Sequence, residues 1–343
     1  MGVYSQYIDT DSIESIRLNS NEVYMDLDYD LKQKLKKSLS NLEFNRYPSN
    51  DMSEIKKLYA DYADVKPENI IVCNGSDESL DIIIGSIIND NKKVLTLSPD
   101  FVMYDFFTNM FKGKLVKYDV GTKMSFNMDE FIALGKSEDV DLIVFSNPNN
   151  PTGMAVNLAD ILKLLNEFKD KTVIIDEAYY EFNGETVLPY INEFKNLIVT
   201  RTLSKAWGLA ALRMGFLISN EDNINKFMES KVPYTVSSFS KMAAEIVLQD
   251  KQRPIRNAEI IVSERKSLYE NLKKIENASH GSVVFYESKS NYIYGRTENK
   301  ERMLQSLAEN NIYIRNFDGS AFRITVGSSE QNEKLLAVLN NVF

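Results

Sequence analysis

The sequence has very few of the residues on which several common kinds of active site depend. It contains one histidine, His280, and one cysteine, Cys73, among 343 residues. His280 stands beside Gly281 in a polar stretch, so we interpret it as a surface residue and expect neither a histidine-based triad nor a metal site. A single cysteine cannot form an internal disulfide and fits a reducing compartment. Cys73 ends the apolar run 70–73, which favours a core position.

Long apolar runs and positive net charge are also missing. No stretch of 18 apolar residues predicts a membrane span. The net charge is −9, which gives no support to a nucleic-acid or anionic-membrane partner. The start of the chain has no basic-then-apolar secretory pattern, and Gln6 interrupts the myristoylation pattern after Gly2. We therefore expect a cytoplasmic protein that binds neither nucleic acid nor membrane.

The chain is long enough, and with 43% hydrophobic residues apolar enough, to form a large core and more than one domain. Apolar runs alternate with helical patterns along its first two thirds, which predicts a layered α/β domain. The runs at 70–73, 94–98, 115–120, 142–145, 173–175, 197–200 and 214–219 give roughly seven strands. Beyond about residue 250, a long charged helix is followed by shorter strands and helices, which predicts a small α+β unit.

A lysine lies in a loop of small residues directly after one of these strands. Lys205 follows the apolar run 197–200, with the hydroxyls of Thr202 and Ser204 just before it and Arg213 eight residues after it. A lysine amine can form a Schiff base with an aldehyde cofactor. Hydroxyls and a guanidinium can hold that cofactor's phosphate. An ordinary surface lysine in a loop is the alternative interpretation.

Two further strands end in residues that suit the same cofactor. Asp176 and Tyr179 follow the run 173–175, and Asn150 follows the run 142–145 in a Pro/Gly turn. Open α/β sheets bind ligands at the carboxyl ends of their strands. A pyridoxal ring needs a carboxylate at its nitrogen, which Asp176 can supply. Tyr179 and Asn150 are candidate donors to the ring oxygen.

The ordered motifs NNPTG, DEAYxxF and RTLSKAxGLAxLRxG resemble those of the fold-type I pyridoxal-phosphate aminotransferases, most closely the histidinol-phosphate aminotransferase branch. The resemblance runs from about Leu18 to the C-terminus. It implies pyridoxal 5'-phosphate as cofactor, glutamate and 2-oxoglutarate as substrates, and a homodimer. It also implies a three-layer α/β fold with a mostly parallel seven-stranded sheet at 26–249. A small α+β unit at 250–343, with the arm 1–25, closes over it.

The resemblance assigns further residues to the cofactor. The glycine turn that opens a helix after residue 74 matches the family's phosphate site, and helix N-termini bind phosphate through free amides and the helix dipole. Tyr104 matches an aromatic that stacks on the ring, although a helical core stripe explains it equally. Tyr47, in Arg46-Tyr47-Pro48, matches a tyrosine that reaches the partner's cofactor phosphate. The phosphate-site residues implied are Gly75, Ser76 and Asp77.

Substrate contacts are implied in the same way. Arg323 matches an arginine that holds the substrate α-carboxylate, and Arg315 matches one that contacts a distal phosphate. Asn21 and Asn291 match pocket positions less specifically. The chain departs from the family at three places. Residues 23–25 replace an expected proline, the tyrosine-proline-glycine signature that precedes this motif in many histidinol-phosphate enzymes is missing, and the loop 316–320 is short.

Three functions follow, in which Lys205, Asp176 and Tyr179 are the expected catalytic residues. The first is an aminotransferase that acts on a small phosphorylated amine or carbonyl compound. The second is a decarboxylase of a phosphorylated amino acid, since threonine-phosphate decarboxylase is built on the same scaffold. The third is a non-catalytic binding or regulatory module. The complete set of cofactor residues argues against the third.

Overall fold

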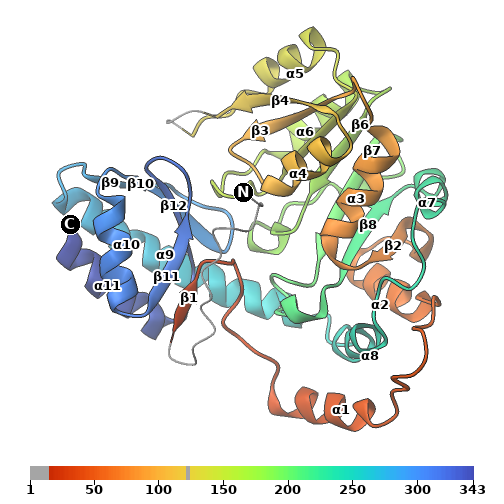
Figure 1. Ribbon diagram of the computed structural model, residues 1–343, viewed down its shortest axis with the longest axis horizontal. Helices are drawn as coiled ribbons and strands as arrows, with labels where there is room; N and C mark the ends of the chain where they lie inside the picture. The colour runs from red at the N-terminus through yellow and green to blue at the C-terminus, as the bar shows by residue number, and fades with distance from the viewer. Residues whose placement is uncertain (1–14, 121–123) are drawn as a thin grey trace.

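The computed structural model describes residues 15–120 and 124–343. The first part of the expected arm, residues 1–14, and the terminal pattern around Gly2 and Gln6 lie outside the described residues. Two separate sheets, each covered by helices, form two lobes of the molecule (Figure 1).

The larger sheet has seven strands in the order β2-β8-β7-β6-β5-β3-β4. All neighbouring pairs are parallel except those of β8, which runs antiparallel to β2 and to β7. The expected mostly parallel seven-stranded sheet is therefore confirmed. Its strands are β2 Ile70–Cys73, β3 Lys93–Ser98, β4 Lys114–Asp119, β5 Leu142–Ser146, β6 Thr172–Asp176, β7 Leu197–Thr202 and β8 Gly215–Ser219.

Helices cover both faces of this sheet, because the strands are apolar on both sides. In β2, Ile70 and Val72 belong to one core cluster, whereas Ile71 and Cys73 belong to another on the opposite face. The first face packs against α2, α5, α6 and α8, and the second against α3, α4 and α7, which makes three layers. The bounds are α2 Ser53–Ala63, α3 Gly75–Ile87, α4 Val102–Met110, α5 Met128–Ser137, α6 Leu158–Glu167, α7 Glu221–Met228 and α8 Ser238–Val247.

The smaller sheet has five strands in the order β1-β11-β12-β10-β9, of which β1 pairs with β11 in parallel. The sequence patterns did not predict β1, because three residues are too few to show a period. The helices α9, α10 and α11 pack with this sheet around a core of their own. The bounds are β1 Ile16–Leu18, α9 Arg253–Ala278, β9 Val283–Phe285, β10 Tyr292–Thr297, α10 Lys300–Glu309, β11 Ile312–Asn316, β12 Ala321–Thr325 and α11 Ser329–Val342.

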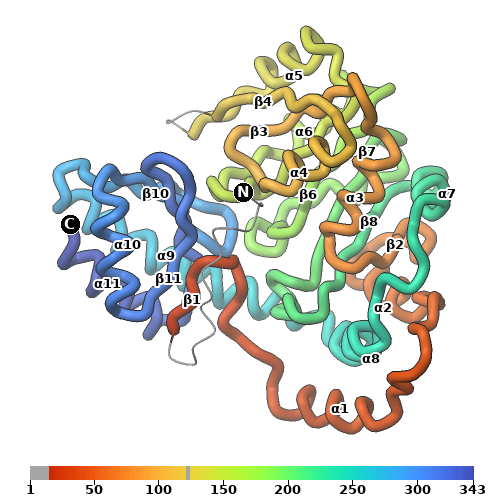
Figure 2. The backbone as a smooth tube through the Cα atoms, in the orientation of Figure 1, coloured from red at the N-terminus to blue at the C-terminus, as the bar shows by residue number. Residues whose placement is uncertain are grey.

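Two segments connect the lobes. Helix α9 runs from the larger lobe into the smaller one, and the chain after β1 crosses back toward α1 (Figures 1 and 2). α1 is rich in lysine and has no buried residue, so it lies against solvent. The remaining helices are α1 Tyr29–Leu39 and the 3₁₀ turns η1 Pro67–Asn69, η2 Tyr180–Phe182, η3 Leu188–Tyr190 and η4 Ala210–Leu212.

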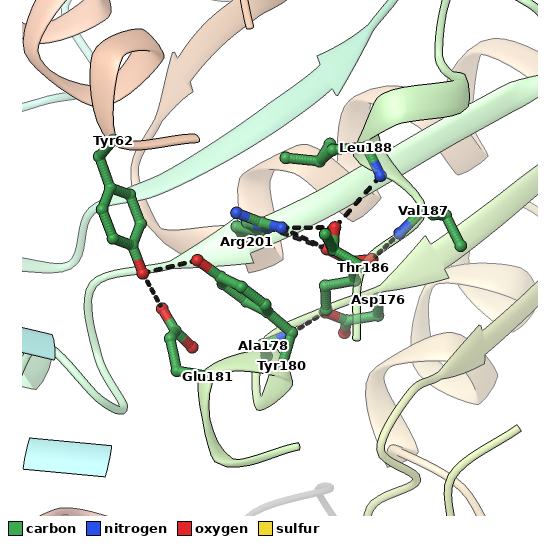
Figure 3. A network of polar contacts seen from close by, with 10 residues as sticks. Tyr62, Asp176, Ala178, Tyr180, Glu181, Thr186, Val187, Leu188 and Arg201 are labelled. Carbon is green, nitrogen blue, oxygen red and sulfur yellow. Dashed lines mark hydrogen bonds and ion pairs between the residues drawn. The ribbon is translucent and has the colours of Figure 1, made fainter. Parts of the chain in front are cut away.

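A buried ion pair joins the ends of β6 and β7. Arg201 donates from Nε and Nη2 to Glu177 Oε2 at 2.9 and 2.7 Å, and both side chains are 2% exposed. Glu177 also accepts from Thr186 Oγ1 and from the Val187 amide. The Arg201 guanidinium lies 3.4 Å from the centre of the Tyr180 ring. Figure 3 shows how this network surrounds the turn that follows Asp176.

Removal of one partner leaves the other charge buried without its counter-ion. We expect Arg201→Met to lower the free energy of unfolding by about 3–5 kcal/mol. The double variant Glu177→Gln/Arg201→Met removes both charges, so its free energy of unfolding should fall by less than that of Arg201→Met. Urea unfolding at a fixed protein concentration measures both.

The matched control is Lys334→Met, because Lys334 pairs with Glu330 on the surface and the two side chains are 58% and 76% exposed. Exposed pairs contribute about 0–1 kcal/mol. An Arg201→Met variant no less stable than Lys334→Met would contradict a structural role for the buried pair.

Candidate active site

The expected cofactor residues meet at one edge of the larger sheet. β5, β6 and β7 are parallel neighbours, and their register places Ser146 beside Asp176 and Asp176 beside Thr200. The segments that leave these strands carry Asn150, Tyr179 and Lys205. Side chains from residues up to 55 positions apart are thereby gathered at the carboxyl ends of three strands, where open α/β sheets bind ligands.

Asp176 is a buried carboxylate whose hydrogen bonds come from uncharged groups. It is 2% exposed, accepts from the Tyr104 hydroxyl at 2.9 Å and accepts from the Ala178 amide at 3.2 Å. Burial raises the pKa of Asp176 to about 6. A cationic ring nitrogen beside this carboxylate would supply the missing counter-charge and lower the pKa again.

Lys205 carries a partly buried amine. Nζ donates to the Ser20 carbonyl at 3.0 Å and lies 5.6 Å from the centre of the Tyr179 ring. Burial, with the nearby Arg323 guanidinium second, lowers the pKa of Lys205 to about 8. A lysine with this pKa has a substantial neutral fraction near neutrality, as a nucleophilic amine requires.

The expected phosphate residues form a compact cluster at the start of α3. Arg213 donates to Asp77 at 3.1 Å and to Ser204 at 3.3 Å. The Thr202 hydroxyl lies 3.0 Å from Ser204 Oγ and so positions it. Gly75 has φ +78, and a Cβ on it would lie 2.9 Å from Arg213 Nη2. The cluster thus presents a guanidinium, a serine hydroxyl and a helix N-terminus together.

Each of the two candidate donors to the ring oxygen contacts a residue from outside the larger sheet. Tyr179 is 5% exposed, and its hydroxyl accepts from Asn21 Nδ2 at 2.9 Å. The Asn150 carbonyl oxygen accepts from Arg323, which leaves the amide nitrogen of Asn150 to donate. Tyr104 is fully buried and directs its hydroxyl to Asp176, so it belongs to the site and to the core at once.

The expected substrate residues come from the smaller lobe. Arg323 in β12 and Arg315 in β11 are direct cross-strand partners, and each guanidinium lies within 6 Å of the Phe317 ring. Arg323 Nη2 also donates to the Asn19 carbonyl at 2.9 Å. Asn291 donates to the Asn21 carbonyl at 2.9 Å, so both asparagines are joined inside the site.

Tyr47 is placed differently. Its side chain is 84% exposed, and its ring stacks on Tyr234 with 5.3 Å between centroids. An exposed tyrosine stacked in this way is held at the surface, outside the network around Asp176 and Lys205.

Sequence patterns missed several groups that the fold brings to the site. The Asn19 and Ser20 carbonyls contact Arg323 and Lys205, but backbone groups leave no signature in side-chain type. Thr325 contacts Asn21 from β12, where a threonine is an ordinary strand residue. Gly215 had a signal, since it ends the LRxG motif. A Cβ there would lie 2.3 Å from the Ser76 amide nitrogen, so only glycine allows β8 to pass the phosphate cluster.

These residues fit pyridoxal phosphate on three structural grounds. The partly buried amine of Lys205 has a lowered pKa, and the buried Asp176 carboxylate accepts its hydrogen bonds from two uncharged donors, Tyr104 and Ala178. The third ground is a glycine-lined cluster with an arginine at a helix N-terminus. Together they provide an attachment point, a counter-charge for the ring and an anion site.

Comparison with known proteins agrees with this geometry. The family model for aminotransferases of class I and II matches residues 13–339, and the chain belongs to this family. It is therefore a pyridoxal-phosphate-dependent enzyme.

The particular relatives share one name. The chain is 39% identical over 325 residues to the histidinol-phosphate aminotransferase of Clostridium novyi, which covers 94% of this chain and 90% of that protein. The crystal structure of the histidinol-phosphate aminotransferase from Clostridium acetobutylicum superimposes with a TM-score of 0.84 at 26% identity, over 95% of this chain and 98% of that one. The crystal structure of the histidinol-phosphate aminotransferase from Sinorhizobium meliloti, in complex with pyridoxal-5'-phosphate, superimposes with a TM-score of 0.84 at 20% identity. The match covers 96% of this chain and 90% of that one.

Residues 15–120 and 124–343 lack two other kinds of feature. None of the helices in this part of the chain is long and apolar enough to cross a membrane. The same residues contain no group of three or more histidine, cysteine, aspartate or glutamate side chains placed to hold a metal ion.

The raised pKa of Asp176 predicts how the stability of the variant Asp176→Asn depends on pH. The folded protein keeps its proton up to about pH 6, whereas the unfolded chain loses it near pH 3.8. The cost of burying the charge therefore grows as the pH rises between these values and is complete above about 6. We expect Asp176→Asn to stabilise the cofactor-free protein at pH 7.5 by roughly 1–3 kcal/mol, with the gain vanishing toward pH 4.

The same variant loses the counter-charge for the cofactor ring, so transamination falls by at least about a hundredfold. Urea unfolding between pH 4 and 8 and steady-state kinetics measure the two effects. Asp139→Asn is the control, because the Asp139 side chain is 90% exposed. A loss of stability in Asp176→Asn at pH 7.5 would contradict the assigned burial cost.

Proposed function

We propose that this enzyme transfers an amino group between glutamate and a small phosphorylated partner, with histidinol phosphate as the amine and 2-oxoglutarate as the acceptor. The proposal has its main support in the pair Arg315 and Arg323, which face each other across β11 and β12. Like charges placed directly opposite in a sheet are unfavourable, so this pair favours an anionic ligand. The similarity to histidinol-phosphate aminotransferases supports the same substrate class.

Each cofactor residue has a role in this proposal. Ser76, Asp77 and Gly75 supply the start of α3 to the phosphate, and Ser204 and Arg213 contact it from the Lys205 loop. Thr202 orients Ser204. When bound, pyridoxal phosphate supplies the electron sink that stabilises negative charge at the substrate α-carbon.

The protein supplies the proton chemistry. Asp176 keeps the ring nitrogen protonated, while Tyr179 and Asn150 donate to the ring oxygen. Lys205 Nζ would hold the cofactor, and as a free amine it would act as the general base that takes the proton from the substrate α-carbon. Its lowered pKa of about 8 suits an amine that both accepts and returns a proton.

The substrate contacts divide between two arginines. We place the glutamate α-carboxylate on Arg323 and the phosphate of the second substrate on Arg315. Asn21 and Asn291 join the arm to the smaller lobe beside them. In this proposal residues 26–249 hold the cofactor, and residues 1–25 with 250–343 close over it. The lone buried thiol fits work in the reducing cytoplasm.

The two arginines separate the substrates in a kinetic experiment. A hydrogen bond to a charged group contributes roughly 1.5–3 kcal/mol, so Arg315→Ala should lower kcat/KM for histidinol phosphate by about 10–100-fold. It should leave glutamate turnover nearly unchanged, whereas Arg323→Ala should impair glutamate. Glutamate formation from 2-oxoglutarate measures the reaction.

Arg302→Ala is the matched control, since Arg302 is exposed on α10. Release of carbon dioxide from a phosphorylated amino acid without 2-oxoglutarate would show a decarboxylase instead. Cofactor binding without turnover of either kind would show a non-catalytic module. An Arg315→Ala variant that turns over every phosphorylated amine normally would contradict the phosphate assignment.

We further propose a homodimer in which Tyr47 completes the partner's phosphate site. Tyr47, Phe44 and Tyr29 are 84%, 81% and 74% exposed, a large apolar area to leave in water. Tyr47→Ala should weaken cofactor binding by about tenfold, the loss of one hydrogen bond to a charged group.

Mixed dimers test the shared site. The Lys205→Ala chain is inactive, and the Tyr47→Ala chain is largely unloaded when the cofactor is kept well below its weakened dissociation constant. Under that condition a dimer of the two has one intact site only if Tyr47 acts on its partner. Mixing the two variants after reversible dissociation should restore activity. No recovery, with dimers confirmed by sedimentation, would place Tyr47 in its own site.

A further inference from the structure

Among the described residues of the arm, 15–25, Asn21 has a buried polar side chain within the site. Asn21 follows β1, is 1% exposed and has φ +55. Asparagine and aspartate are the residues other than glycine that adopt this left-handed conformation most readily. A polar side chain buried in a constrained backbone conformation indicates a specific task at this position.

The orientation of the Asn21 amide is fixed from the smaller lobe. The backbone N–H of Asn21 donates to Thr325 Oγ1 at 3.0 Å, and the Thr325 hydroxyl donates to Asn21 Oδ1 at 3.2 Å. The Thr325 hydroxyl uses a lone pair to accept from the backbone, and it gives its one proton to Oδ1. The Asn21 side-chain oxygen therefore points to Thr325 and its NH₂ group points away.

That NH₂ group meets the hydroxyl of Tyr179. Asn21 Nδ2 donates to Tyr179 Oη at 2.9 Å. A tyrosine hydroxyl has one proton to give, and this contact uses an oxygen lone pair only. The Tyr179 proton is therefore left for another acceptor.

We propose that Asn21 is a positioning residue that makes Tyr179 an obligatory hydrogen-bond donor to the ring oxygen of the bound cofactor, through the chain Thr325–Asn21–Tyr179. This inference rests on the role proposed above for Tyr179. It adds two residues, Asn21 and Thr325, whose effect on the cofactor is exerted through Tyr179.

The consequence is measurable in the cofactor itself. A donor at the ring oxygen stabilises the negatively charged oxygen, and more strongly when the nitrogen that joins the cofactor to Lys205 is deprotonated. The donor therefore lowers the pKa of that nitrogen. Loss of the donor raises the pH at which the visible absorbance of the bound cofactor changes.

Other charged groups around Tyr179 act on the same transition. Arg323 and Lys205 are the nearby cations, while Asp176 and Asp77 are the nearby carboxylates. The Tyr292 ring packs edge-on at 5.2 Å. Burial raises the pKa of Tyr179, which keeps its proton in place across the working range. The test variants leave all of these groups unchanged.

The experiment titrates the absorbance of the cofactor-loaded protein with pH. Tyr179→Phe removes the donor and should raise the transition by about one to two pH units. Asn21→Asp tolerates the left-handed backbone but offers only oxygen, so it takes the Tyr179 proton and should raise the transition at least as far. Thr325→Val frees the Asn21 amide to rotate and should give a smaller rise without any change in charge. Thr325→Ser keeps the hydroxyl and should restore the wild-type transition.

The outcomes distinguish the positioning role of Asn21 from the role of Tyr179 as a donor to the ring oxygen. If Tyr179→Phe shifts the transition but Asn21→Asp and Thr325→Val do not, the inference about Asn21 is wrong and the role of Tyr179 stands. If Tyr179→Phe itself causes no shift, the role of Tyr179 fails and the inference fails with it. Equal shifts in Thr325→Val and Thr325→Ser would also overturn it, because a structural disturbance would then explain both.

Discussion

The burial of one carboxylate at the ends of three parallel strands is the constraint on which the site depends. Asp176 receives hydrogen bonds from Tyr104 and Ala178, both uncharged, in a place that water does not reach. Such a charge is costly until a cation arrives. The neighbouring Glu177–Arg201 pair joins the ends of β6 and β7, so these strand ends stay in place despite the free-energy cost of burying the Asp176 charge. Asp176 thus lowers the stability of the cofactor-free protein for the sake of cofactor binding. The apolar core around β6 and β7 offsets this loss of folding free energy.

Much of this arrangement can be predicted from sequence, because it depends on local patterns. Apolar runs that end in Asn150, Asp176 and Lys205 give both the strands and their functional ends, since parallel strands share one ligand-binding edge. The seven-stranded sheet follows from the same runs. Gly75 and the acidic residues after it mark the start of α3. These predictions need no knowledge of distant contacts.

The rest depends on contacts between segments that are far apart in the chain. β1 is too short to be periodic and exists because β11 pairs with it. Glu177 and Arg201 lie within the motifs that also contain the cofactor residues Asp176 and Lys205. Only the fold shows that Glu177 and Arg201 form an ion pair with each other. Thr325 and Asn21 are separated by 304 positions. No pattern in either segment predicts that they meet.

The arm has a consequence for how ligands enter. With the Ser20 carbonyl on Lys205 and the Asn19 carbonyl on Arg323, backbone oxygens contact one partly buried and one buried cation much as water would. An incoming carboxylate on Arg323 therefore replaces the Asn19 carbonyl oxygen with its own oxygens, and the guanidinium is not exposed without an acceptor. Ligand exchange then has a low reorganisation cost. The arm thus holds the Lys205 amine in position while the cofactor is absent, and it holds the Arg323 guanidinium in position until a substrate carboxylate arrives.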